Sequence, residues 1–153
     1  NSYLKSNYVH KKFGLSCFAD DSGLFIKALN GDPGVKSARY ASDKSDSDLN
    51  IDLVLKNLER ETNRDAFFET YICLIINDET HYFKGTIHGK ISKLRLGSAG
   101  FGYDPIFIPD GHKKSFAQMT LDEKNKISHR AIAIKKLVKF LNKKWNDIWN
   151  FWL

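Results

Sequence analysis

The chain has 153 residues, 42% of them hydrophobic, which suits a single domain with a buried core and excludes an intrinsically disordered polypeptide. The 24 Lys and Arg residues outnumber the 18 Asp and Glu residues, and the resulting net charge of +6 favours acidic partners such as phosphates or reflects a solvated lysine-rich surface. No apolar run approaches the ~18 residues of a membrane-spanning helix.

The N-terminal third is expected to begin with a helix over residues 1–13, closed by Gly14 in the left-handed conformation. A short apolar strand over residues 15–19 follows. Asp20–Gly23 has the composition of a turn, and residues 24–29 are a second strand candidate.

The middle of the chain predicts one amphipathic helix and one hairpin. Residues 45–48 offer N-caps to a helix whose apolar residues recur at i, i+3, i+4 and i+7. Residues 66–76 and 81–92 are rich in aromatic and β-branched residues and predict two long paired strands. We therefore expect a single α/β domain over residues 1–153, with a mixed β-sheet flanked by helices and this antiparallel hairpin inserted.

The C-terminal sequence is helical, and a capping box at residues 120–123 begins it. In the last helix, apolar residues alternate in steps of four and three, with lysines opposite them. The expected buried face consists of Ile127, Ala131, Ile134, Val138 and Leu141.

The two cysteines, Cys17 and Cys73, lie in apolar, strand-like runs and are too few for a disulfide framework. We expect both to be buried, reduced thiols in a cytoplasmic protein. The chain begins with Asn1 and not with Met, so the sequence is also compatible with a removed leader.

Asp20 and Asp21 form the first candidate site. In the expected turn, their carboxylates project from the end of a strand, where α/β folds bind ligands. Such carboxylates suit Mg²⁺, which prefers hard oxygen ligands, and they also suit the orientation or deprotonation of a water molecule. A plain hairpin turn has the same composition, and both interpretations stay open.

The segment Gly100–Asp104 is the second candidate, because Phe101 stands between two glycines. The ring is placed to offer its face to a flat ligand such as a nucleobase, a contact worth ~1–3 kcal/mol. A loop whose Phe plugs the edge of the core fits the spacing equally well.

Ser128, His129 and Arg130 are the third candidate. If Ser128 caps the last helix, the other two residues lie in its first turn, where cations are unfavourable unless an acceptor-rich ligand compensates them. Because Arg only donates hydrogen bonds, it would accept a purine with a 6-keto oxygen and reject one with a 6-amino group. The alternative is one unbroken helix from Leu121 that carries both residues on its surface.

These motifs, in this order, resemble the inosine triphosphate pyrophosphatase family, which removes non-canonical purine nucleotides. The resemblance runs from residue 1 to about residue 141. It rests on Ala19–Leu24, Ala28–Gly31, Pro33–Val35, Ser37–Tyr40, Gly100–Phe107, Ser115–Ala117, Glu123–Asn125 and Ile127–Arg130. It implies an α/β structure with a nucleotide cleft between two lobes, a cytoplasmic homodimer, and Mg²⁺-dependent hydrolysis of ITP, dITP and XTP to the monophosphate and pyrophosphate.

The same resemblance implies the site residues. Asp21 would be the catalytic carboxylate and a metal ligand, with Asp20 beside it as a second ligand. The implied substrate contacts are Lys5 for the phosphates, Ser22, the base-pocket residues Phe101, Gly102, Tyr103 and Asp104, and Lys124, His129 and Arg130 for the base and sugar. By position alone, Lys5 and Lys124 fit solvated surface lysines equally well.

Two departures accompany the resemblance. The family has a buried strand, a Thr/Ser-x-Asn-x-x-Lys loop and a metal-binding glutamate before the position of Asn1, so we expect the 153-residue chain alone to have little activity. Residues 142–153 extend beyond the family's usual end. These residues carry an apolar stripe that comprises Trp145, Ile148, Trp149 and Trp152. We expect the stripe to pack on the core or on a partner subunit, in preference to anchoring the chain at a membrane surface.

Two other functions stay open on the sequence. One is a non-catalytic nucleotide or nucleic-acid binder, and the other is an inactive truncated remnant of the enzyme. No stable nucleic-acid complex is expected, because the aromatic residues are not interleaved with a basic groove. No membrane partner is expected either.

Overall fold

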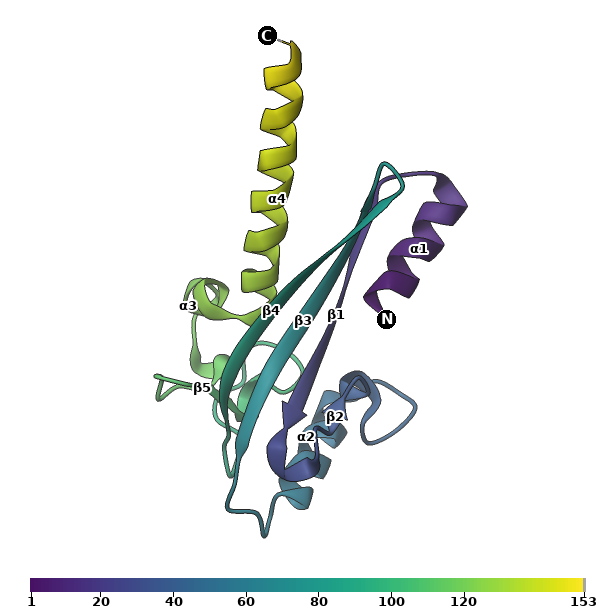
Figure 1. Cartoon of the computed structure of the whole chain (residues 1–153). Helices are drawn as coiled ribbons and strands as arrows, with labels where there is room; N and C mark the ends of the chain where they lie inside the picture. The colour runs from purple at the N-terminus through teal and green to yellow at the C-terminus, as the bar shows by residue number, and fades with distance from the viewer. Residues whose placement is uncertain (153) are drawn as a thin grey trace.

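The computed structural model describes the backbone of residues 1–152 and the side chains of residues 1–145. A long twisted sheet with the strand order β2-β1-β3-β4-β5 forms its centre (Figure 1). The strands are β1 (Cys17–Ile26), β2 (Pro33–Gly34), β3 (Asp65–Ile76), β4 (Glu79–Ile91) and β5 (Phe107–Pro109). The α-helices are α1 (Ser2–Phe13), α2 (Ser47–Asn57), α3 (Leu121–Ile127) and α4 (His129–Trp152).

The α/β fold with helices flanking a sheet is confirmed, and so is the inserted hairpin. β3 and β4 pair along their whole lengths through a two-residue turn, Asn77–Asp78, in which both residues have positive φ (51° and 64°). Such a turn matches the twist of a hairpin. The expected sheet was mixed, whereas all strand pairs among the described residues are antiparallel.

The expected strand–turn–strand at residues 15–29 is wrong. β1 is one continuous strand that pairs with β3 along its entire length, so Asp20–Gly23 are strand residues. Lys27–Leu29, expected within a second strand, form a short 3₁₀-helix. The long neighbouring strand β3 offers a continuous ladder of donors and acceptors, and this pairing outweighs the local turn preference of Asp, Ser and Gly.

The sheet is covered on both faces. A larger apolar cluster joins α2 to β1, β3 and β5, and its members include Leu24, Ile51, Val54, Phe107 and Phe116. A smaller cluster under α4 contains Ile72, Leu74, Phe83, Ala133 and Leu137.

On the other face, α1 packs against β1 and β3. The buried Ser6 of α1 donates a hydrogen bond to the Cys73 carbonyl of β3 at 2.8 Å.

The helix is interrupted at Ser128, between α3 and α4, so the alternative of one unbroken helix from Leu121 is excluded. Ser128 Oγ accepts a hydrogen bond from the Ala131 N–H at 3.2 Å, as an N-cap does. The buried face of α4 differs from the expected one, since Ile134 and Val138 are exposed and Ala133 and Leu137 are buried.

Both thiols are free and Cys73 is buried, as expected, whereas Cys17, which was also expected to be buried, is only half-buried. None of the described helices combines the length and hydrophobicity needed to cross a bilayer. Trp145 is largely exposed, and the side chains of Ile148, Trp149 and Trp152 lie outside the described residues, so the role of the stripe stays a prediction.

The N-cap of α2 gives a first testable consequence. Asp46 accepts hydrogen bonds from the Asp48 and Leu49 N–H groups, both at 3.0 Å. Asp46→Ala leaves these donors unpaired and is expected to lower the free energy of unfolding by about 1 kcal/mol in urea denaturation. Asp43→Ala, an exposed position just before the helix, is the matched control and should change stability by less than about 0.5 kcal/mol.

Candidate functional site

A cavity of about 370 Å³ opens beside the middle of β1. Segments far apart in the sequence meet here, from α1, β1, the loop before η3 (Asp104–Ile106) and the start of α4. Every predicted site residue except Lys124 lines the cavity: Lys5, Asp20, Asp21, Ser22, Phe101, Gly102, Tyr103, Asp104, His129 and Arg130. Lys124 lies next to them, where it donates to the carboxylate of Asp104.

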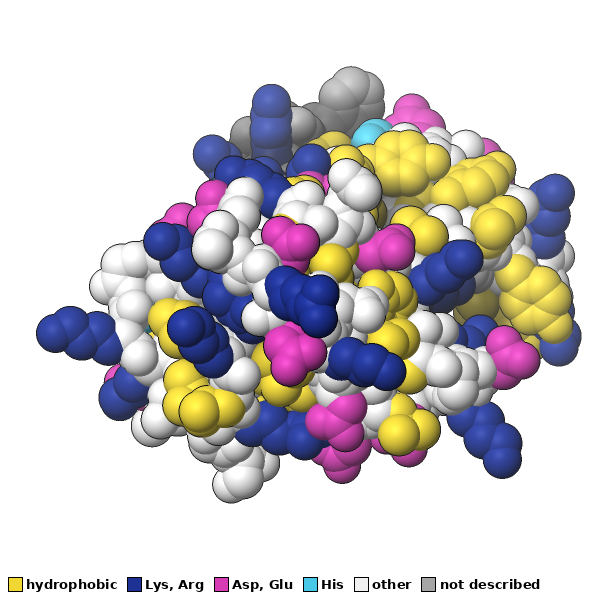
Figure 2. Space-filling model, turned by 90° about the horizontal axis from the view of Figure 1, so that it is seen from below, with side chains coloured by type: hydrophobic (Ala, Val, Ile, Leu, Met, Phe, Trp, Pro, Cys, Tyr) yellow, Lys and Arg dark blue, Asp and Glu magenta, His cyan; other side chains and the backbone are white. Residues whose placement is uncertain are grey.

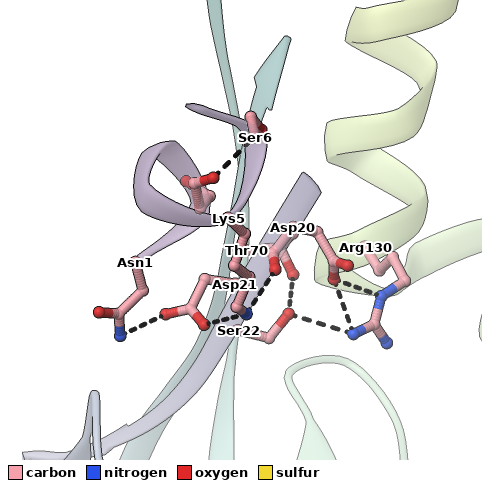
Figure 3. A network of polar contacts seen from close by, with 9 residues as sticks. Asn1, Lys5, Ser6, Asp20, Asp21, Ser22, Thr70 and Arg130 are labelled. Carbon is pink, nitrogen blue, oxygen red and sulfur yellow. Dashed lines mark hydrogen bonds and ion pairs between the residues drawn. The ribbon is translucent and has the colours of Figure 1, made fainter. Parts of the chain in front are cut away.

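The two adjacent aspartates point to opposite faces of β1, because side chains alternate along a strand. Asp21 faces α1, where its carboxylate accepts from Lys5 Nζ at 2.8 Å and from the Asn1 side-chain amide at 3.0 Å (Figure 3). Asp20 faces α4 and accepts from the guanidinium of Arg130 at 2.9 and 3.0 Å (Figure 3). Both carboxylates are therefore held by cations, but by different ones.

Ser22 links Arg130 of α4 to the neighbouring strand β3. Its hydroxyl lies 2.7 Å from the Thr70 hydroxyl on β3 and accepts from Arg130 at 3.3 Å (Figure 3). Thr70 is fully buried. Thr70 was not predicted as a site residue, because a single Thr in a long strand carries no local signal of a role.

The aromatic segment divides into an exposed ring and a buried wall. Phe101 is 64% exposed, so it does not plug the core, and its face is available to a flat ligand. Lys124 Nζ lies 4.6 Å and the Arg130 guanidinium carbon 5.6 Å from the centre of this ring. Tyr103 is buried, and its hydroxyl donates to the Ser37 carbonyl at 2.9 Å. Burial raises the pKa of Tyr103, so the phenol stays protonated.

Asp104 and Lys124 form a buried ion pair beside the Phe101 ring, with side-chain exposures of 4% and 13%. The Asp104 carboxylate also accepts from the Phe101 N–H at 2.9 Å. This pair fixes the loop that presents the ring.

The imidazole of His129 is buried and stacks on Phe68, with ring centres 4.6 Å apart and planes 11° apart. In the described part of the chain, no polar group is within hydrogen-bonding distance of its buried Nδ1. Burial, together with the smaller effect of the Arg130 and Lys124 charges, lowers the pKa of His129 to about 3. His129 is therefore a neutral group with one unpaired nitrogen, at the wall of a cavity whose ligand can supply a partner.

The depressed pKa of His129 predicts a pH dependence of stability. His129 has a pKa near the ordinary value of 6.5 in the unfolded chain and near 3 in the folded chain. Its titration therefore leaves the free energy of unfolding unchanged above pH 6.5 and lowers it as the pH falls from 6.5 towards 3, where only the unfolded chain binds the proton. We expect an added slope of up to about 1.4 kcal/mol per pH unit in this window.

The measurement is urea unfolding of wild type and of His129→Phe, which keeps a ring on Phe68 but does not titrate. Equal slopes between pH 6.5 and 4 in the two proteins would contradict this account of His129.

Two further residues at the cavity were missed. Asn50 of α2 is buried, accepts from the Ala41 N–H at 2.7 Å and donates to the Ala38 carbonyl at 3.1 Å. Ser37 donates to the Gly34 carbonyl at 2.6 Å. Together they hold the wall of the cavity opposite α4. The one signal in the sequence for Asn50 is that a polar residue directly precedes the apolar stripe of α2.

Comparisons with known proteins show what the chain is similar to. The sequence profile described as the Ham1 family matches residues 1–140. A dITP/XTP pyrophosphatase of Flavobacterium psychrophilum is 51% identical over 140 residues, which cover 92% of this chain and 74% of the relative. A dITP/XTP pyrophosphatase of Bacillus subtilis is 45% identical over 144 residues, 92% of this chain and 73% of the relative.

Solved structures show the same fold. The Ham1 protein of Staphylococcus aureus superposes with a TM-score of 0.90 at 42% identity, over 94% of this chain and 75% of that one. A HAM1 protein from Coxiella burnetii gives a TM-score of 0.89 at 38% identity, over 93% and 75% of the two chains. With a family profile over residues 1–140 and relatives of this identity, the chain belongs to the Ham1 family.

Proposed function

We propose that this chain is a nucleoside triphosphate pyrophosphatase that hydrolyses non-canonical purine nucleotides, dITP, ITP and XTP, to the monophosphate and pyrophosphate. The observation that carries the proposal is the convergence of Asp21, Phe101 and Arg130 on one cavity. Relatives named dITP/XTP pyrophosphatase, at 40–51% identity, support the choice of substrate.

Recognition of the base follows from the donors around the Phe101 ring. Lys124 and Arg130 both lie over this ring, and both only donate hydrogen bonds. A hypoxanthine or xanthine ring stacked on Phe101 would offer its 6-keto oxygen to these donors, whereas the 6-amino group of adenine would oppose them. His129 also lines the cavity, and its buried Nδ1 has no hydrogen-bond partner among the described residues. We expect a preference of at least ~100-fold for dITP over dATP.

The phosphate end lies on the α1 side of β1. Lys5 sits beside Asp21 with its ammonium at the cavity wall, and it is placed to neutralise phosphate charge. Asp21 orients a water molecule and takes its proton as the water oxygen attacks phosphorus. The α–β phosphoanhydride bond breaks, and pyrophosphate leaves with the electron pair. Positioning and charge neutralisation provide most of the rate in such a reaction.

Magnesium is the proposed cofactor. The described His, Cys, Asp and Glu residues form no cluster of three or more that could hold a metal ion by itself. Mg²⁺, however, is usually held by one or two carboxylates together with substrate phosphates and water, and the Asp21 carboxylate fits that role. Asp20 fits less well, because it points to the other face and is paired with Arg130. When bound, Mg²⁺ would neutralise the charge of the phosphates.

We also propose a cytoplasmic homodimer. Free thiols at Cys17 and Cys73 suit a reducing compartment. The outer side of α1 exposes Leu4 and Tyr8, apolar side chains of the kind that subunit contacts use. Analytical ultracentrifugation at micromolar concentration would separate a monomer from a dimer.

A nucleic-acid binder is not favoured. On the face shown in Figure 2, Lys and Arg side chains are dispersed among acidic and apolar groups, and they do not line a continuous groove. The cavity that Phe101 and Arg130 line, of about 370 Å³, also suits one nucleotide better than a strand.

The test is Mg²⁺-dependent pyrophosphate release from dITP, XTP and dATP. The chain spans about three quarters of the length of its relatives. We expect pyrophosphate release from dITP and XTP to exceed release from dATP. Release from neither substrate, or equal release from dATP, would contradict the proposed function.

A further inference from the structure

A row of three residues crosses the sheet beneath the first turn of α4. Ser22 of β1 lies opposite Thr70 of β3, and Thr70 lies opposite Gly85 of β4. The Ser22 and Thr70 hydroxyls are hydrogen-bonded to each other at 2.7 Å, and Ser22 also contacts Arg130. The row therefore touches α4 at the residues that face the nucleotide cavity.

Gly85 is the point of closest approach. A Cβ atom built on Gly85 would lie 2.0 Å from the His129 carbonyl oxygen and 2.6 Å from the Ala133 backbone nitrogen. These are backbone atoms, which cannot move aside as a side chain can. Gly85 is not among the residues with positive φ, so conformation does not require glycine here. The lack of a side chain serves the close contact with α4.

We propose that Gly85 and Thr70 are positioning residues, which set the height and rotation of the first turn of α4 and so place His129 and Arg130 for base recognition. The effect on base recognition rests on the proposed function, whereas the effect on the position of α4 rests on the packing alone. Neither residue touches the nucleotide. Both act through the two residues of α4 and through Ser22.

The stacking of His129 shows why the distance between the first turn of α4 and the sheet matters. Its ring is stacked on Phe68 of β3, so a displacement of α4 would slide the imidazole off that ring. The same displacement would lengthen the hydrogen bonds from Arg130 to Asp20, now 2.9 and 3.0 Å. A misplacement of about 1 Å costs roughly 100-fold in rate when positioning is responsible for the reaction.

Gly89 provides a matched control on the same strand. A Cβ atom there would lie 2.3 Å from the Ile108 carbonyl oxygen and 2.7 Å from the Phe107 ring, so the clash is with β5 and not with α4. Gly85→Ala and Gly89→Ala therefore impose the same kind of crowding at different neighbours.

The experiment compares these two variants with wild type in thermal unfolding and in kcat and KM for dITP and dATP. We expect both variants to melt at lower temperature. Only Gly85→Ala should lower the ratio of kcat/KM for dITP to that for dATP, by about tenfold or more. Equal losses of this ratio in the two variants, or a wild-type ratio in Gly85→Ala, would overturn the proposal.

A second readout does not depend on the enzymatic activity. In wild type, the His129 ring protons should have NMR signals shifted upfield by the stacked Phe68 ring. Gly85→Ala should lose this shift, and Gly89→Ala should keep it; retention in Gly85→Ala would overturn the positioning role. If wild type hydrolyses neither dITP nor XTP, the proposed function fails, while the NMR comparison still decides the positioning.

Thr70 covers the case in which Gly85→Ala does not fold. Thr70→Val removes the hydroxyl that holds Ser22 and keeps the shape, so we expect a several-fold higher KM for dITP with little change in kcat. Thr70→Ser restores the hydroxyl and should restore KM. A wild-type KM in Thr70→Val, or no recovery of KM in Thr70→Ser, would contradict the proposal that Ser22, Thr70 and Gly85 position the first turn of α4.

Discussion

Asp21→Asn is expected to reduce the kcat for dITP hydrolysis by about 10²–10⁴-fold, the range for loss of a general base. The amide keeps the size of the carboxylate, and its oxygen still accepts from Lys5, so the local structure should persist. It cannot, however, take a proton from water or neutralise a magnesium ion. Binding of dIMP, which has no phosphoanhydride to cleave, should change by less than about tenfold in calorimetry.

The control for Asp21→Asn is Asp65→Asn. Asp65 lies at the start of β3 in an exposed ion pair with Lys27, at side-chain exposures of 42% and 60%. Its substitution should leave kcat within about twofold of wild type. Retention of more than about a tenth of the wild-type kcat in Asp21→Asn would remove Asp21 from the reaction.

Asp104→Asn is expected to lower the free energy of unfolding by about 3–5 kcal/mol. The change leaves the Lys124 ammonium, 13% exposed, without its counter-charge at a site where the partner carboxylate is only 4% exposed. It also weakens the hydrogen bond that holds the Phe101 N–H. Urea denaturation monitored by circular dichroism measures the effect.

The double variant Asp104→Asn/Lys124→Met tests the cause of this loss. Removing the unpaired ammonium should recover part of the stability lost in Asp104→Asn, because an apolar side chain needs no counter-charge. Asp65→Asn, in the exposed pair, should cost no more than about 1 kcal/mol. A cost below 1 kcal/mol in Asp104→Asn would show that the pair does not stabilise the loop.

The elements that local sequence determines were predicted well. The β3–β4 hairpin follows from two aromatic and β-branched runs, and its turn residues Asn77 and Asp78 tolerate positive φ. The capping box at Thr120 forms as expected, with the Thr120 hydroxyl accepting from the Glu123 N–H at 3.1 Å. In these cases, the interaction that fixes the structure lies within a few residues.

The faces of helices α1 and α4 were harder to predict, because distant contacts decide them. Leu4 and Tyr8 have the spacing of an apolar helix face, yet both are about two-thirds exposed, and the buried positions of α1 are Ser2 and Ser6. The hydrogen bond from Ser6 to the backbone of β3, 67 residues away, offsets the cost of burying a hydroxyl. No local pattern reveals such a partner.

The same distinction applies to the site. The motifs predicted which residues line the cavity, but they did not reveal how Asp20 and Asp21 divide between α4 and α1. That division depends on β1 being a strand and not a turn, which the pairing with β3 imposes. Thr70 and Gly85 were missed because their roles arise from the register of three strands and from the docking of α4.

The central claim is that one cavity holds the base, the sugar and the phosphates of a 6-keto purine nucleotide. A crystal structure with bound dIMP tests it most directly. The claim predicts the hypoxanthine ring against Phe101, its 6-keto oxygen within hydrogen-bonding reach of Lys124 or Arg130, and the phosphate directed towards Lys5 and Asp21. Nucleotide bound outside this cavity, or with its ring turned away from Phe101, would contradict the claim.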